Sequence, residues 1–209
     1  MAHKSTCQQT GLFSITQPRS CISVDQLESP MLGLIAQMKR FLMTKRYNAA
    51  TIFIDNYNGL SYVYLQQSTK SNETLRAKRA FEQYATSHGV TIQHYHSDNG
   101  LFINKEWMDD LRTHCQGQSL AGVNAHHQNG VAEKRIRDLQ DAAWTMLIHA
   151  QQNWPEAINT ALWPYALRTA NDVHKNSTKM LTGTTPIEDF SQVQVRPKLN
   201  HMHIFGCPV

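Results

Sequence analysis

Cysteine is scarce in this sequence and is never closely paired. The chain of 209 residues contains four cysteines, Cys7, Cys21, Cys115 and Cys207, and no two of them form a C-x-x-C motif. A zinc ribbon requires such pairs, and a disulfide-stabilised secreted domain requires a higher density of cysteine. Both classes are therefore excluded, and we expect reduced thiols in an intracellular protein with no zinc site.

Long apolar runs are also missing. No stretch approaches the roughly 18 consecutive apolar residues of a membrane-spanning helix. The N-terminal residues MAHKSTCQQTG lack the apolar segment of a secretory signal, and neither an internal repeat nor a low-complexity tract is present. We therefore expect a soluble protein without a membrane partner.

Neither sign of charge dominates the chain. The 20 Lys and Arg residues exceed the 16 Asp and Glu residues by four, and charged residues make up 17% of the sequence. Such a surplus permits a nucleic-acid partner but does not require one, because a nucleic-acid footprint depends on local clustering of basic groups. The hydrophobic content of 41% is sufficient for a core, and the length suits one large domain or one domain with a tail.

The hydrophobic pattern predicts an alternation of strands and helices. Three strands come first, followed by a helix, a strand, a helix, a short strand, a long helix and a last helix. A hairpin turn joins the second and third strands, and a helical crossover then leads to a further strand, which implies a mixed sheet covered by helices. The predicted strands are 21–27, 49–55, 60–66, 90–96 and 119–123, and the predicted helices are 72–88, 104–114, 131–150 and 154–173.

Capping and turn residues set the expected ends of these elements. Ser71 is expected to cap the first helix and Gly89 to end it. Pro155 suits the first turn of the last long helix, and residues 185–190 are expected to form a further helical turn. Residues 29–48, which contain a proline, a glycine and two basic pairs, are expected to form an inserted loop.

Most charged residues on the predicted helices are interpreted as solvated. This interpretation covers Arg76, Lys78 and Arg79 on the first helix and Asp110 on the second. Asp55 ends a strand at a turn, where a hydrogen bond from the backbone to its carboxylate accounts for it.

Three other acids are harder to assign to ordinary structural roles. Asp25 lies within an otherwise apolar strand, where an unpaired carboxylate is costly to bury. Asp98 ends another strand before Asn-Gly, and Glu133 falls in the first turn of the long helix, where the helix dipole favours an acid. Each one alone is better explained structurally. Together, two strand acids and one acid at a helix entrance are able to converge on a divalent cation.

The segments around these acids resemble one family. The sequences SVDQ at 23–26, SDNG at 97–100 and HQNGVAEK at 127–134 closely resemble the integrase core of copia-type retrotransposons. The resemblance runs from Asp25 to Val173 and more weakly to the end of the chain. Between Asp98 and Glu133 lie 34 residues, one fewer than is usual in that family.

The resemblance implies both a fold and a reaction. The fold is expected to be α/β, a ribonuclease H-like mixed five-stranded sheet flanked by helices. Asp25, Asp98 and Glu133 match the catalytic, metal-binding carboxylates of the family, which hold Mg²⁺ or Mn²⁺, as two ions. The implied activity is end processing and strand transfer of DNA, by a homo-oligomer that acts on element ends and target DNA in the nucleus.

The same motifs indicate DNA-binding residues. By family position, Gln128 and Asn129 are expected to touch DNA near the cut. Lys134 and Arg137 follow Glu133 on the helix and are candidates for phosphate contacts. For Arg137, a simple ion pair with Glu133 at i,i+4 spacing is an equally good explanation.

The resemblance also divides the chain. Residues 1–20 are expected to be an irregular lead-in, 21–175 the catalytic core, and 176–209 a truncated C-terminal extension. The His/Cys zinc module that precedes the core in the family has no counterpart here, and neither does a downstream basic region. We therefore expect a piece of a larger polyprotein.

Three alternatives remain open from the sequence. The chain is also compatible with a ribonuclease H-like nuclease that cleaves RNA in hybrids, or with an inactive remnant that binds nucleic acid without cutting it. The histidines and one cysteine at positions 94, 96, 114, 115, 126 and 127 offer a weak case for zinc, because their spacing matches no compact site.

Overall fold

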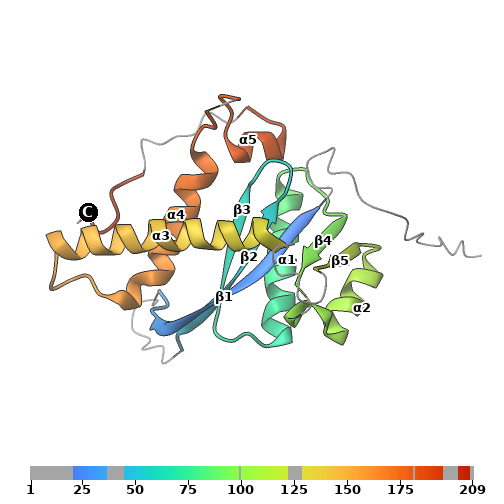
Figure 1. The fold of residues 1–209 in the computed structure, drawn as a ribbon, viewed down its shortest axis with the longest axis horizontal. Helices are drawn as coiled ribbons and strands as arrows, with labels where there is room; N and C mark the ends of the chain where they lie inside the picture. Colours follow the sequence, from blue (N-terminus) through green and yellow to red (C-terminus); the bar gives the residue numbers. More distant parts are fainter. Residues whose placement is uncertain are drawn as a thin grey trace, which may run out of the picture.

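A five-stranded mixed sheet forms the centre of the molecule (Figure 1). The computed structural model describes residues 21–36, 45–98, 100–121, 129–180, 182–194 and 202–207. The strands lie in the order β3-β2-β1-β4-β5, with the first three antiparallel and β4 and β5 parallel to β1. Their bounds are β1 Ile22–Gly33, β2 Tyr47–Asp55, β3 Ser61–Gln66, β4 His94–Ser97 and β5 Gly117–Leu120.

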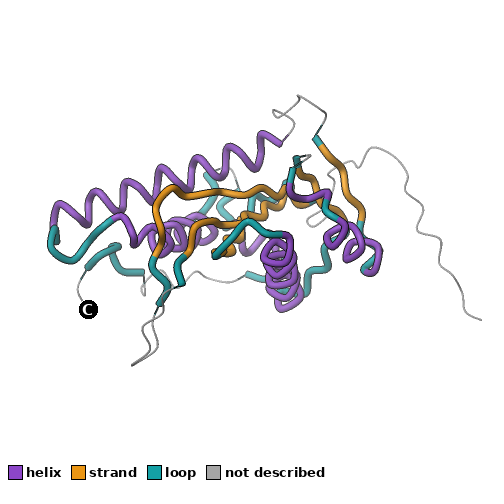
Figure 2. The backbone as a smooth tube through the Cα atoms, turned by 90° about the horizontal axis from the view of Figure 1, so that it is seen from below, coloured by secondary structure: helices purple, strands orange, loops and turns teal. Residues whose placement is uncertain are grey.

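Helices cover both faces of this sheet, as the edge-on view in Figure 2 shows. The helices α3 and α4 pack on one face, whereas α1, α2 and α5 pack on the other. Two short 3₁₀ helices, η1 and η3, precede α2 and α4. The bounds are α1 Ser71–Ser87, η1 Leu101–Ile103, α2 Lys105–Thr113, α3 Gly130–Asn153, η3 Thr160–Leu162, α4 Trp163–Asn176 and α5 Pro186–Ser191.

The strand β2 explains why the sheet needs two helical layers. Residues 49–55 are buried without exception, as expected for a strand covered on both faces. Ile52 and Ile54 point into the cluster shared with α3 and α4, whereas Phe53 points to the opposite side and stacks on Phe81 of α1 at 4.7 Å between ring centroids. The predicted fold class is therefore confirmed.

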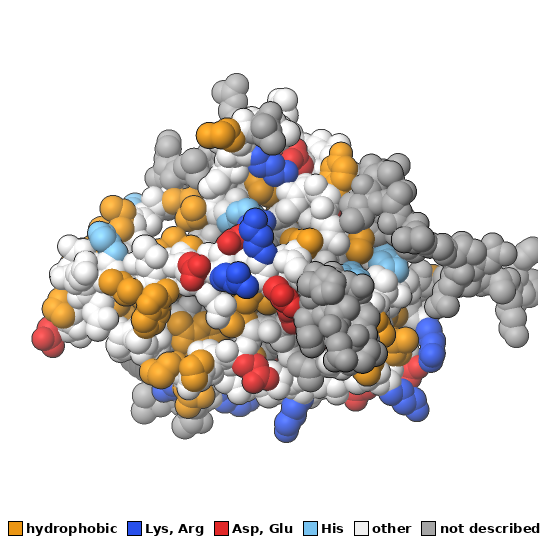
Figure 3. All heavy atoms as spheres, viewed as in Figure 1, with side chains coloured by type: hydrophobic (Ala, Val, Ile, Leu, Met, Phe, Trp, Pro, Cys, Tyr) orange, Lys and Arg blue, Asp and Glu red, His pale blue; other side chains and the backbone are white. Residues whose placement is uncertain are grey.

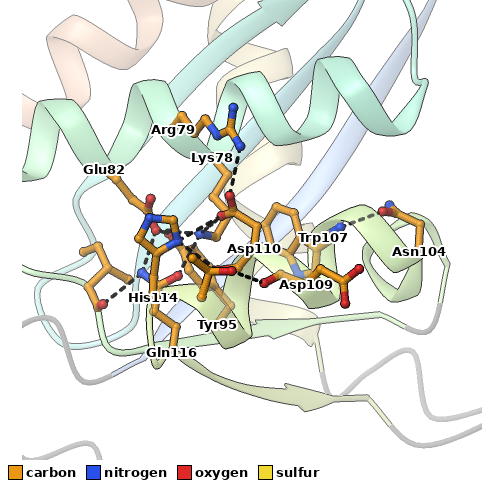
Figure 4. Close-up of polar contacts among 12 residues, drawn as sticks. Lys78, Arg79, Glu82, Tyr95, Asn104, Trp107, Asp109, Asp110, His114 and Gln116 are labelled. Atoms are coloured by element: carbon orange, nitrogen blue, oxygen red, sulfur yellow. Dashed lines mark hydrogen bonds and ion pairs between the residues drawn. The ribbon is translucent and has the colours of Figure 1, made fainter. Parts of the chain in front are cut away.

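The charged residues Lys78 and Asp110 are buried, which corrects the expectation that they are solvated. The Lys78 side chain is 0% exposed, and its Nζ donates hydrogen bonds to Asp110 Oδ2 at 2.6 Å and to Gln116 Oε1 at 2.7 Å (Figure 4). A third bond reaches Glu82 Oε1 at 2.9 Å. Lys78 lies on the buried stripe of α1 beside Ala77 and Phe81, so its burial follows from position and is permitted by the carboxylates around it.

Two predicted boundaries were wrong, and in both the structural role assigned to a proline was incorrect. Strand β1 runs on to Gly33 through the region predicted as a loop, with an irregular register between Glu28 and Gly33 that accommodates Pro30. The helix predicted from residue 154 begins only at Trp163, and Pro164 rather than Pro155 lies in its first turn. A helix through Pro164 would lack an N–H and clash with the preceding turn.

At the ends of α1 and α5, some of the predicted capping and turn residues act as expected and one does not. Gly89 has φ +71° after α1, and Thr185 forms a capping box with Glu188 at α5, as the sequence predicts for both regions. Ser71 does not cap α1, because its hydroxyl donates to Glu106 Oε2 instead. Among the described residues the cysteines are free thiols, and no helix there has the length and apolarity to cross a membrane.

Candidate functional site

Asp25 lies where the parallel part of the sheet opens. Strand β4 pairs with β1 only through Ile22–Val24, and the last pair is Val24 with Ser97. On its other edge, Asp25 remains paired with Ile52 of β2. Asp25 and Asp98 are consequently the first residues beyond the ladder on two neighbouring parallel strands.

The carboxylate of Asp25 belongs to the sheet face that α3 covers. Side chains alternate between faces along a strand, so Asp25 shares its face with Leu27. Leu27 packs in the same cluster as Ala132 and Leu139 of α3. The strand therefore presents Asp25 toward the helix that carries Glu133.

Glu133 lies in the first turn of α3, immediately after the fully buried Ala132. Burial of Ala132 holds this turn against the sheet, while Glu133 itself remains partly exposed. An acid in a first helical turn is favoured by the helix dipole. This placement leaves the Glu133 carboxylate available to a ligand at the edge of the sheet.

The Asp25 carboxylate is affected by the charges of both other acids. Burial raises the pKa of Asp25 to about 6, against the lowering effect of a hydrogen bond from Gln26 N to Oδ1 at 2.8 Å, and the negative charges of Asp98 and Glu133 raise it further. Charge effects of this kind require proximity. Residues distant in sequence are thus brought into one region, as three converging acids would require.

The carboxylates are near one another but are not gathered as ligands. In the described ranges, no three His, Cys, Asp or Glu side chains are close enough to hold a metal ion. Coulombic coupling extends beyond ligand distances, so this finding is compatible with the raised pKa of Asp25. Like charges favour such a separation when no cation neutralises them.

The turn after β4 orients Asp98. Its Oδ1 accepts a hydrogen bond from Gly100 N at 3.1 Å, in the manner of an Asx turn. This bond is made by Oδ1, so Oδ2 is not engaged by Gly100 N. The local Asp-x-Gly sequence therefore accounts for how the carboxylate is held at the strand end.

The predicted DNA-binding residues have different surroundings. Gln128 lies outside the described residues, and Asn129 is buried at 1% exposure. Lys134 and Arg137 are exposed on α3. Within the described part of the chain no ion pair joins Arg137 to Glu133, so the structure does not show the pairing that was the alternative to a phosphate contact.

Arg135, which no sequence motif singled out, turns inward from the same part of α3. Its Nη1 lies 2.9 Å from Nδ1 of His174 on α4, and His174 Nε2 lies 3.1 Å from the carbonyl oxygen of Gly59. These contacts connect the beginning of α3 to α4 and to the turn between β2 and β3. The helical position of Arg135 next to the buried Ala132 was the available signal.

Two of the histidines considered for zinc act between strands instead. His94 Nε2 and His96 Nδ1 lie 3.0 and 2.8 Å from the Oγ atom of Ser119 on β5. His114 Nδ1 lies 2.8 Å from the carbonyl oxygen of Asp110 in the last turn of α2. His126 and His127 fall outside the described residues.

Comparison with known proteins finds structural but not sequence relatives. No family model and no curated protein matches the chain. The catalytic core domain of HTLV-2 integrase in complex with magnesium aligns with a TM-score of 0.57 at 15% identity, over 84% of this chain and 98% of that one. The BIV integrase catalytic core domain gives a TM-score of 0.58 at 18% identity, over 83% and 95%.

A longer viral chain contains a region of similar fold. A chain of the simian T-cell lymphotropic virus intasome aligns with a TM-score of 0.62 at 12% identity over 87% of this chain. The alignment covers only 57% of the length of the viral chain. At these identities the likeness concerns the fold. The chain has the ribonuclease H-like fold of retroviral integrase catalytic cores, as the sequence predicted.

Proposed function

We propose that this chain is the catalytic core of a DNA-integrating enzyme that processes DNA ends and transfers them to a target strand. The observation that carries the proposal is geometric: Asp25 and Asp98 are the first residues beyond the β1–β4 ladder, and Asp25 lies on the sheet face covered by α3, whose first turn carries Glu133. The fold is that of integrase catalytic cores, and the charges of Asp98 and Glu133 both raise the pKa of Asp25. We assign these three residues as the catalytic carboxylates.

The donor set fits a hard divalent cation. All three groups offer oxygen, which Mg²⁺ and Mn²⁺ prefer, and the raised pKa of Asp25 reflects a partly buried negative region that a cation would relieve. Asp25, Asp98 and Glu133 would together hold the metal, as two Mg²⁺ ions by the family resemblance. Bound ions of this kind neutralise developing charge on a phosphodiester and activate an attacking oxygen.

The chain itself supplies binding and orientation. Lys134 and Arg137 project from α3 next to Glu133, where they contact DNA phosphates in this proposal. Figure 3 shows acidic and basic side chains side by side on the face that α3 crosses, rather than a uniformly basic surface. Local basic groups near the acids therefore position the DNA, and Gln128 is proposed as a further contact.

The origin and setting of the enzyme follow from the motifs. SVDQ, SDNG and QNGVAE resemble copia-type retrotransposon integrases, so we propose such an element as the source. The HTLV-2 core is known in dimeric and trimeric forms, which supports a homo-oligomer here as well. DNA is then the partner, and integration takes place in the nucleus.

A branched DNA substrate that mimics a joined end tests the activity. We expect cleavage by the wild-type chain in Mn²⁺ or Mg²⁺ and a loss of about 100-fold or more in Glu133→Gln, because the lost interaction acts on the transition state. Glu156→Gln makes the same chemical change at an exposed acid beyond α3 and should retain the wild-type rate.

Two results would reject the proposal. One is cleavage that persists in excess chelator, and the other is equal rates for wild type and Glu133→Gln. An RNA–DNA hybrid tests the alternative of a ribonuclease. Preferential cleavage of its RNA strand would show that this same site hydrolyses RNA and does not transfer DNA strands.

A further inference from the structure

Asn129 is a buried polar residue at the entrance of α3. It directly precedes Gly130, the first residue of the helix, and lies four residues before Glu133. Its exposure is 1%, which is unusual for asparagine at a helix entrance. A side chain this buried has no surface with which to contact DNA directly in this conformation.

Asn129 does not perform the usual role of an asparagine at a helix start. Such a residue normally accepts a hydrogen bond from a backbone N–H in the first turn. Asn104 does so at α2, where its Oδ1 accepts from Trp107 N at 2.8 Å. Asn129 occupies the same position at α3 but makes no side-chain cap bond.

The Asn129 side chain turns toward the central strand instead. Its Nδ2 donates to the carbonyl oxygen of Val24 at 3.4 Å. Val24 precedes Asp25 and is the last residue of β1 that pairs with β4. The bond therefore joins the beginning of α3 to the backbone at the point where β1 and β4 separate.

This arrangement is poorly explained by stability alone. Asn129 Oδ1 is buried with no hydrogen-bond partner in the described part of the chain. A buried acceptor without a partner is unfavourable, whereas an apolar residue of similar size would avoid that penalty. The amide donates its one hydrogen bond to the backbone of Val24, which directly precedes Asp25. A role in positioning Asp25 and α3 would explain why an asparagine is present here.

We propose that Asn129 is a positioning residue, which fixes the first turn of α3 to β1 so that Glu133 and Asp25 face one another at a constant separation. The inference rests on the proposed function of these two acids. In this proposal Asn129 positions the catalytic residues and does not itself contact DNA. Catalytic geometry is sensitive to small displacements, so loss of this link should reduce turnover more than DNA binding.

Two variants of similar size remove the Asn129 donor, one with an apolar side chain and one with an anionic side chain. Asn129→Leu removes both polar groups, and Asn129→Asp removes the donor but keeps an acceptor. Phe190→Leu, in the core on the opposite face of the sheet, provides a variant that lowers stability without touching α3. Asn72→Leu repeats the asparagine-to-leucine change at an exposed position of α1.

Turnover on the branched DNA substrate is one readout. For both Asn129 variants we expect kcat to fall about tenfold or more with KM for DNA within about twofold, since an interaction that aligns groups acts on the transition state. Phe190→Leu and Asn72→Leu should keep kcat close to that of the wild type. Wild-type kcat in Asn129→Leu, or an equal fall in Phe190→Leu, would overturn the inference.

Amide hydrogen exchange is a readout that needs no activity. Exchange at residues 133–136, whose N–H groups are the first in α3 with a carbonyl partner four residues earlier, should accelerate at least about tenfold in Asn129→Leu, while amides of β2 and β3 keep their wild-type protection. Unchanged exchange at 133–136 would overturn the inference even if strand transfer were established. Conversely, accelerated exchange in a chain without strand-transfer activity would support the link and reject the proposed function separately.

Discussion

Arg135 and His174 form a contact that fixes the protonation state of the histidine. Arginine has no acceptor, so Arg135 Nη1 donates to His174 Nδ1 at 2.9 Å. The carbonyl oxygen of Gly59 has no proton to give, so His174 Nε2 donates to it at 3.1 Å. Both bonds are possible only for neutral His174 with its proton on Nε2. The link between α3, α4 and the β2–β3 turn therefore depends on pH.

Stability should fall as acid protonates His174. Burial is the main cause that lowers the pKa of His174 below 6.5, and the charge of Arg135 lowers it further. Lys179 acts in the same direction, whereas Asp138 and the Gly59 carbonyl oppose it. The unfolded chain takes up the proton near pH 6.5 and the folded chain only at lower pH. This stabilisation is thus complete above pH 6.5 and declines as pH falls below it.

The measurement compares urea unfolding of the wild type and His174→Gln between pH 7.5 and 5. Asp25, with its pKa raised to about 6, contributes a pH dependence of the opposite sign in the same range. Both proteins contain Asp25, so the difference between them isolates His174. The free energy of unfolding should decline more steeply toward acid in the wild type. Parallel curves would contradict the assignment.

A divalent cation should stabilise the folded chain. The negative charges of Asp98 and Glu133 disfavour the ionised form of Asp25 when no cation is bound, and an ion bound by the native state adds stability by mass action. At about 100 times its Kd, Mg²⁺ or Mn²⁺ should contribute about 2.7 kcal/mol and raise Tm by about 5–10 °C. Thermal unfolding followed by circular dichroism measures the shift.

Asp98→Asn tests the origin of that shift. Asparagine keeps the oxygen that accepts from Gly100 N but removes one negative charge, so Tm without metal should rise and the response to metal should shrink. Asp141→Asn, at an exposed position two turns beyond Glu133 on α3, should respond to metal as the wild type does. Identical melting of wild type and Asp98→Asn with and without metal would reject this metal site.

A tight contact at the end of β1 predicts a local steric effect. A Cβ atom at Gly33 would collide with Pro164 Cγ and lie 2.7 Å from Trp163 Nε1. Gly33→Ala should therefore destabilise the chain by about 1–3 kcal/mol in urea unfolding, as overpacking does in a filled region. Gly130→Ala meets no atom within 4 Å and should leave stability within about 1 kcal/mol of the wild type.

The fold was predictable because its signals are local and repeated. The β-branched and aromatic run in 49–55, the helical apolar period of 131–150 and the Asn-Gly turn before β3 each specify an element independently of the rest of the chain. Short motifs around Asp25, Asp98 and Glu133 then indicated which strand ends and which helix entrance belong together. Their electrostatic coupling is in agreement with that indication.

What the sequence did not indicate depends on contacts between distant residues. Nothing adjacent to Asn129 shows that its amide reaches Val24, which lies 105 residues earlier. Arg135 and Lys134 are neighbours of the same type, yet one turns inward to His174 and the other is exposed. Helical spacing fixes the direction of a side chain, but only the packed neighbour decides whether a charge there has a partner.

Lys78 and Asp110 give the largest expected effect on stability. Their ion pair is almost fully buried, and Arg79 donates a further bond to Asp110 Oδ1 at 3.1 Å. Removing one partner of a buried pair typically costs about 3–5 kcal/mol when no other charge compensates, but about 2–3 kcal/mol is expected here because Glu82 Oε1 still lies 2.9 Å from Lys78 Nζ. We therefore expect Asp110→Ala to lower the free energy of unfolding by about that amount, measured in urea. Asp109→Ala is the neighbouring control, because the ion pair of Asp109 with Arg112 is exposed.

The double variant Lys78→Met/Asp110→Leu distinguishes charge from packing. Both charges leave the core together, and well-packed apolar residues often replace such a pair without loss. The double variant should consequently be more stable than Asp110→Ala, although Glu82 and Gln116 then lose the Nζ donor that they share. If the double variant were instead less stable than the single one, Lys78 would stabilise α1 chiefly through Glu82, Gln116 and its contact over the Tyr95 ring at 5.4 Å.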